Sequence, residues 1–340
     1  MALATSYNVT ADKGSRENLE SLLKTVEPTE TPLYSTLSQS AAPKATLNEW
    51  LVDSLADPEI GGVIDGVDLD LSTAQNLIDS RARLGNRVQT FRDYFAVSRQ
   101  AEMVDVAPGG SLFNASKAKS LIQLKRSIES AIGSGNDQVA GSGSTGALLC
   151  GLGIWSDPTA TGNTFDTTAK EAFRAVSGSR VSLASLTEDA LRGLLQAVYT
   201  ASGAKSNFKL FAGPAVMNKI TDYTRATVSD NPSYQFTQDV SGKSLIRSVL
   251  SYVSDFGSID IIPDLFLGRV NGTPSGTDTA EGVVNTDRAY LIPDDDTVSL
   301  KFLEGISVME LPDNGGGKRA FSECMATFRI GNPRALGSIV

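Results

Sequence analysis

The chain has 340 residues, of which 41 % are hydrophobic and 20 % charged, and its formal net charge is −9. This length is enough for one large domain or two ordinary domains with cores of their own. The chain contains no histidine, which excludes Ser-His-Asp and Cys-His catalysis and His-ligated zinc, and its acidic balance argues against a tight grip on nucleic-acid phosphates. The sequence has neither an apolar run of membrane-spanning length nor a secretion leader, so we expect no membrane partner and folding in a cytoplasm.

The first predicted elements are a short helix over residues 15–24 and an extended arm after it. Pro28 and Pro32 end the helix, because each fixes φ, removes an amide donor and favours extended geometry in the residue before it. An extended arm has little core of its own, so it must lie on another surface. The apolar side chains that need this cover are Leu33, Tyr34 and Leu37.

A charge asymmetry follows the arm. Residues 45–80 contain eight acidic side chains and no Lys or Arg, whereas residues 81–99 contain five arginines and one aspartate. The stretch 87–98, "RVQTFRDYFAVS", has the β-branched and aromatic content of a strand. We interpret residues 46–100 as a two-stranded excursion with an acidic outgoing limb and a basic returning limb. Two alternatives stay open: the limbs pair across their own hairpin, or the basic limb meets acidic residues of a neighbouring copy.

The longest predicted helix covers residues 111–132. An apolar stripe that is interrupted by charged residues steps three and four apart along it, at Ala118, Leu121, Ile122, Lys125, Ile128 and Ile132. Gly133 follows the last of them, as is usual at the end of a helix. A glycine-rich connector then runs to residue 153.

The next part of the chain alternates helix and strand patterns, which predicts an α/β subdomain. The predicted elements are a helix at 188–202, a strand at 208–213, a helix at 214–224 and a strand at 258–267. The last fifty residues are β-rich and include a long strand at 318–330. We expect this portion to pack with the long helix, which makes residues 155–287 an insertion between them.

Motifs that suggest chemistry are incomplete. Residues 237–244, "TQDVSGKS", end like a phosphate-binding loop but lack its first glycine and its leading hydrophobic strand. The acidic run 294–296 lacks the spacing of a calcium loop, and the Ser-x-x-Lys pairs lack the companion motifs of acyl-enzymes. Cys150 and Cys324 are expected to be buried, reduced thiols. We therefore predict no enzyme, no catalytic, cofactor or metal site, and no cofactor. A nucleotide-binding enzyme that uses residues 241–244 is the least favoured alternative.

The order of these elements resembles the major capsid proteins of tailed bacteriophages, whose fold herpesvirus capsid floors share. The stretches that carry the resemblance are "SRENLESLLKTVEPTETPLYSTL" (15–37), "NEWLVDSLADP" (48–58), "LKRSIESAI" (124–132), "YVSDFGSIDIIPD" (252–264) and "SECMATFRIGNPRALGSI" (322–339). The resemblance implies an α+β fold in four parts: an N-terminal arm (1–45), an extended loop (46–100), a peripheral domain (101–150 and 289–330) with a spine helix at 111–132, and an α/β axial domain (151–288 and 331–340).

The resemblance also implies a function. The chain would be a structural protein that self-assembles into hexamers and pentamers of an icosahedral phage head, assembled in the host bacterial cytoplasm around double-stranded DNA that it does not bind sequence-specifically. Expected partners are further copies of the chain, a separate scaffolding protein, a portal and, optionally, decoration proteins. A bacterial nanocompartment shell of the same fold is the alternative.

In this family the arm and loop reach across neighbouring subunits, so the apolar arm residues are expected to have no place in their own subunit. Trp50 is expected to anchor the start of the loop, with an intramolecular core position as the alternative. The candidate contacts between subunits are Leu33, Tyr34, Leu37, Trp50, Arg81, Arg83 and Arg87.

Overall fold

The structure is a computed structural model that describes residues 29–55, 58, 60–62, 65–66, 81–104, 110–203, 206–222, 251–268, 287–312 and 315–340. The helices are α1 (Pro32–Thr36), α2 (Arg99–Met103), α3 (Leu112–Ile132), α4 (Leu152–Trp155), α5 (Thr168–Glu171), α6 (Glu188–Ser202) and α7 (Pro214–Asp222), with 3-10 turns η2 (Leu183–Ser185) and η3 (Pro333–Ala335). The strands are β1 (Ser38–Gln39), β2 (Leu47–Val52), β3 (Ala82–Arg87), β4 (Gln89–Ser98), β5 (Arg180–Val181), β6 (Ser206–Ala212), β7 (Ser251–Ser254), β8 (Gly257–Pro263), β9 (Ala289–Pro293), β10 (Val298–Leu311), β11 (Gly317–Ile330) and β12 (Gly337–Ile339).

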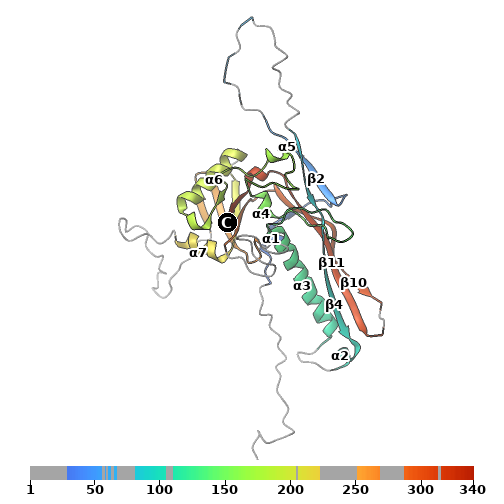
Figure 1. Cartoon of the computed structure of the whole chain (residues 1–340). Coiled ribbons are helices and arrows are strands. Elements are labelled where there is room, and N and C mark those ends of the chain that lie inside the picture. Colours follow the sequence, from blue (N-terminus) through green and yellow to red (C-terminus); the bar gives the residue numbers. More distant parts are fainter. Residues whose placement is uncertain are drawn as a thin grey trace, which may run out of the picture.

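These strands form three sheets (Figure 1). A four-stranded sheet has the order β1-β10-β11-β4, a six-stranded sheet has the order β5-β12-β9-β6-β8-β7, and β2 pairs with β3 as a separate hairpin. Helix α3 runs along the length of the four-stranded sheet, and α6 and α7 lie on the six-stranded sheet. The predicted α+β fold is confirmed. The division into arm, loop and two domains stays a prediction.

Helix α3 confirms the predicted long helix, but its buried face differs from the predicted stripe. Ser111 caps the helix by accepting a hydrogen bond from the Asn114 backbone amide, and Gly133 ends it. Ala118 and Ile122 are exposed, whereas the buried positions are Phe113, Ser120, Leu124, Ile128, Glu129 and Ile132. Two of these are polar and are satisfied by distant partners, which a search for apolar periodicity cannot detect.

Strand β4 confirms the predicted strand at 87–98, yet its partner differs from the prediction. It pairs antiparallel with β11, from Gln89 opposite Ala326 to Ser98 opposite Gly317. Its inward side chains include Phe95, whose ring lies 5.4 Å from that of Phe113 on α3. The excursion expected over residues 46–100 therefore reaches only to β3, since β4 belongs to the four-stranded sheet.

The α/β alternation is also confirmed, because α6, β6, α7 and β8 follow one another along the chain and β6 pairs with β8 in parallel. Thr187 caps α6 through its hydroxyl, and Gly203 ends the helix in the left-handed conformation at φ 68°. The strand predicted to run to residue 267 ends at Pro263, where the chain turns back onto α3: the Gly268 amide donates to the Gly133 carbonyl at 2.7 Å.

Asn86 holds the projecting hairpin to the body of the protein. It is fully buried on β3, where its side-chain amide donates to the carbonyls of Cys150 and Phe328, both at 3.2 Å, and its oxygen accepts from the Cys150 amide at 2.8 Å. One side chain thus satisfies three backbone groups from two other segments.

Replacing Asn86 with alanine should lower the free energy of unfolding by about 2–3 kcal/mol, because it leaves buried backbone groups without partners. Denaturant unfolding measures the loss. The matched control is Asn48→Ala, since Asn48 lies opposite Asn86 on β2 and its side-chain nitrogen makes no hydrogen bond with described residues. If the two variants lose the same free energy of unfolding, the hydrogen bonds of Asn86 do not hold the hairpin to the body.

Candidate assembly surfaces

Among the described residues, no group of three or more His, Cys, Asp or Glu side chains could hold a metal ion. No described helix has the length and apolarity needed to cross a bilayer. Residues 237–244 lie outside the described residues. Cys150 and Cys324 are free and buried, and burial raises the pKa of both thiols, that of Cys324 to about 12, so neither is a ready nucleophile.

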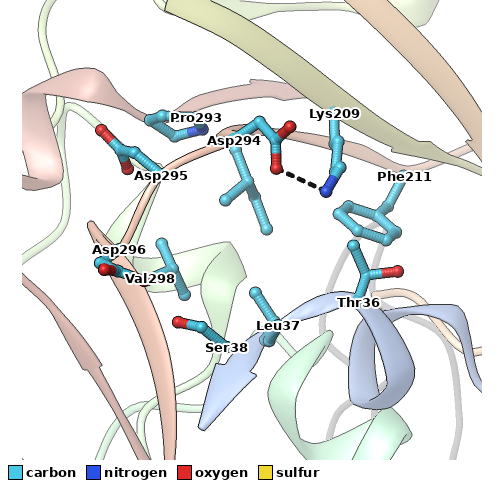
Figure 2. Close-up of a pocket in the computed structure, with 11 residues that line it drawn as sticks. Thr36, Leu37, Ser38, Lys209, Phe211, Pro293, Asp294, Asp295, Asp296 and Val298 are labelled. Atoms are coloured by element: carbon cyan, nitrogen blue, oxygen red, sulfur yellow. Dashed lines mark hydrogen bonds and ion pairs between the residues drawn. The ribbon is translucent and has the colours of Figure 1, made fainter. Parts of the chain in front are cut away.

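The acidic run 294–296 lies in the turn between β9 and β10. There it borders a cavity of about 180 Å³ that is also lined by Leu37 and Ser38 of the arm and by Lys209 and Phe211 of β6 (Figure 2). Asp294 accepts a hydrogen bond from Lys209 at 2.5 Å, and Asp295 accepts from the Thr297 amide at 2.8 Å. These contacts indicate a structural role for the acidic run, as part of a turn that packs beside the arm.

The arm segment folds onto its own subunit, which corrects one expectation. Pro32 begins the short helix α1, and β1 pairs in parallel with β10 at the edge of the four-stranded sheet. Leu33 is 0 % exposed and Leu37 is 8 % exposed, and both belong to the core that includes Leu124 and Ile128. The expectation that these leucines have no place in their own subunit is therefore wrong.

Glu129 of α3 is the polar contact that holds this segment. One oxygen of its carboxyl group accepts from the Leu33 amide at 2.7 Å and the other from the Tyr34 amide at 2.6 Å. These are first-turn amides of α1, which have no partner within the helix. Burial and the neighbouring Asp264 raise the pKa of Glu129 to about 8.

Tyr34 is only partly buried, so it remains available to other contacts. Its ring meets Phe302 of β10 edge-on at 6.1 Å, and the Lys125 ammonium lies 5.7 Å from the ring centroid. Burial raises the pKa of its phenol above the ordinary value. Among the candidate arm residues, Tyr34 alone keeps a surface for a neighbour, and that contact stays a prediction.

The arginines of the hairpin favour the alternative in which the two limbs pair across their own hairpin. Arg81 pairs with Asp53 at 2.9 Å and Arg83 lies 3.7 Å from Glu49, so both arginines meet acids of their own hairpin. All four side chains are substantially exposed. No ion pair to Arg87 is found among the described residues, and its pairing with a neighbouring copy stays a prediction.

Trp50 occupies the intramolecular core position. It is 8 % exposed, and its ring lies 5.8 Å from Trp155, which in turn meets Phe165 edge-on at 5.4 Å. This ring stack joins the base of the hairpin to α4 and the core. Trp50 thus anchors the start of the loop within its own subunit.

Two apolar surfaces were missed in the sequence. Beyond β2 the hairpin carries Leu55 and Ile60, which are 98 % and 99 % exposed. On the four-stranded sheet, the face opposite α3 shows a cross-strand row of Tyr94, Phe321 and Met309. The alternation in "QTFRDYFAVS" indicates this second face, because every other residue of a strand points away from the helix that covers it.

The fold defines the class of protein. The cyanophage A-1(L) capsid asymmetric unit superposes with a TM-score of 0.69 at 14% identity, covering 98% of this chain and 97% of the other. The mature capsid of bacteriophage PhiM1 gives a TM-score of 0.59 at 11% identity, with 96% and 91% covered. The holo-SrpI encapsulin complex of Synechococcus elongatus PCC 7942 gives 0.52 at 13% identity, with 99% and 95% covered. The chain has the fold of tailed-phage capsid proteins, as predicted.

The profile of the SU10 major capsid protein family matches residues 3–340. The chain belongs to this family. A search of curated protein sequences returns no match. The predicted identity as a major capsid protein is confirmed: the chain is a structural protein of the virion, and its partners are other copies of itself.

Proposed function

We propose that the chain builds the hexamers and pentamers of an icosahedral phage head around double-stranded DNA, as a structural protein without enzymatic activity. The observation that carries this proposal is the projecting hairpin, whose apolar side chains Leu51, Leu55 and Ile60 are exposed in the single subunit. Exposed apolar groups on a projecting segment gain little from their own core, so a neighbouring subunit is the surface that would cover them. Many modest contacts of this kind add up in a closed shell.

The net charge of −9 supports the DNA part of the proposal. A strongly basic wall would bind the packaged phosphates and impede their movement. An acidic protein leaves the DNA free while the head fills. We further propose a separate scaffolding protein, a portal, optional decoration proteins and assembly in the host cytoplasm.

Co-expression with the scaffolding protein, followed by electron microscopy of the purified particles, tests the proposal. Closed shells with five- and six-fold capsomers are expected. Subunits that stay monomeric under these conditions would contradict it.

The encapsulin match favours a second candidate, a nanocompartment shell, on fold alone. Analysis of both the nucleic acid and the protein inside the purified particles separates the two. Packaged double-stranded DNA supports the phage head, and a single enriched enzyme supports the compartment.

The arginines of the hairpin provide a prediction about assembly. Reversing the charges of Arg81, Arg83 and Arg87 should impair shell formation while changing the free energy of unfolding little, because exposed ion pairs contribute only about 0.2–1 kcal/mol each. Particle yield and thermal unfolding measure the two effects.

The swap of Asp53→Arg with Arg81→Asp separates the two roles of these charges, since it restores the pair within the hairpin. Rescue of assembly by the swap would mean that the pair serves the hairpin alone. If the swapped variant still fails to form shells, the positive charge at Arg81 contacts a neighbouring copy.

A further inference from the structure

The outer face of α3, opposite its buried residues, carries an apolar strip. Ala115, Ala118 and Ile122 lie three and four residues apart, so their side chains share one face of the helix. All three are exposed, Ile122 at 42 %. We call these three residues the α3 strip. The exposed face of a helix is normally polar, so an apolar strip there indicates a partner that covers it.

Two cations flank the α3 strip. Lys119 and Lys125 lie about 60° around the helix from Ile122, one on either side. Glu129 is the only acid of α3, and it is buried against the arm. No ion pair to either lysine is found among the described residues, and the Lys125 ammonium lies over the ring of Tyr34 instead. A partner of the strip should therefore combine apolar and acidic side chains.

The α3 strip continues the surface on which the arm docks. Glu129 lies two helical turns after Ile122, so the two positions share a face of α3. Glu129 binds first-turn amides of α1. The described part of the chain begins at Thr29, just before α1. The chain that precedes Thr29 thus enters the structure at one end of the strip.

The chain before the arm has the composition that the strip requires. Residues 15–24 lie outside the described residues, and their sequence predicts a short helix. Leu19, Leu22 and Leu23 would share one face of that helix. The connecting residues 25–31 contain two acids and no Lys or Arg. This part of the chain therefore offers an apolar face followed by negative charge.

We propose that residues 15–24 dock as a helix on the α3 strip of their own subunit, with the leucine face on the alanines and Ile122. The reach is sufficient, because residues 25–31 span up to about 23 Å when extended, whereas Ile122 lies about 10 Å along α3 from Glu129. This short tether gives an effective concentration of about millimolar, which favours docking within the subunit over docking on a second copy. The inference concerns a single subunit and is independent of the proposed function.

Thiol labelling of the unassembled, full-length subunit tests the proposal. Ala118→Cys places a reporter thiol in the strip, while Cys150 and Cys324 are buried. We expect iodoacetamide to modify this reporter at least about tenfold more slowly than it does when Leu22→Asp is added, because burial of a leucine side chain shifts the docking equilibrium by about tenfold or more. Mass spectrometry follows both rates.

The matched control is Ser21→Asp, which adds the same charge on the side of the predicted helix opposite the leucines and should keep the slow rate. A second reporter, Ala96→Cys, lies exposed on β4 and should react at one rate with or without either aspartate. Equal rates for Ala118→Cys with and without Leu22→Asp would overturn the proposal. A slow rate that rises when the protein is diluted would also overturn it, since a second copy would then cover the strip.

Discussion

Replacing Leu33 with aspartate should detach the arm from the body and prevent formation of regular shells. Leu33 is fully buried and its amide is bound by Glu129. The new carboxyl group would lie in the apolar core that includes Leu124 and Ile128, and burying an uncompensated charge costs several kcal/mol. The six-stranded sheet should stay folded, because the core cluster of α6, α7, β6 and β8 does not include Leu33 or Leu37. Hydrogen exchange of residues 32–39 and electron microscopy of assembly reactions measure the two consequences.

The control for this variant is Ser35→Asp, which places the same charge on an exposed position of α1. It should leave docking and assembly intact. Normal shells from the Leu33→Asp protein would show that the docked position of the arm is irrelevant to assembly.

Replacing Trp155 with alanine should reduce the free energy of unfolding by about 3–5 kcal/mol, the range typical of removing a buried Trp or Phe side chain. Trp155 is fully buried between the rings of Trp50 and Phe165. The chain has only two tryptophans, so the fluorescence of Trp50 reports unfolding of the variant without interference. A loss below about 1 kcal/mol would mean that burial of the Trp155 indole contributes little to the stability of the subunit.

A double-mutant cycle adds a control. The combined variant Trp50→Ala and Trp155→Ala should lose less than the sum of the single losses, by about 0.5–1.5 kcal/mol, because each single change already breaks the contact of the two indoles. Strict additivity would show that the two rings act independently.

The limits of α3 and α6 could be predicted because local chemistry determines them. Ser111 and Thr187 cap the two helices through hydroxyl contacts three residues away, and Gly133 and Gly203 end them. Capping groups and glycines lie next to the ends that they define, so the information is present in a short stretch of sequence.

The buried face of α3 and the destination of the arm could not be predicted, because both depend on partners far along the chain. Ser120 is buried against Ser322 at 2.6 Å, and Glu129 is buried against the arm. A serine and a glutamate resemble solvent-facing residues until these partners are known. The strand pairing of β4 has the same origin, since alternation indicates which side chains face a core and does not identify the neighbouring strand.

Strand β12 has a consequence for biosynthesis. It lies between β5 and β9, so residues 337–339 complete the interior of a sheet whose other strands are translated earlier. Until the ribosome has made them, β5 has no neighbour in the sheet and β9 offers a bare edge that invites pairing with other chains. Closure of this sheet is therefore a late event that follows synthesis of all the other described strands.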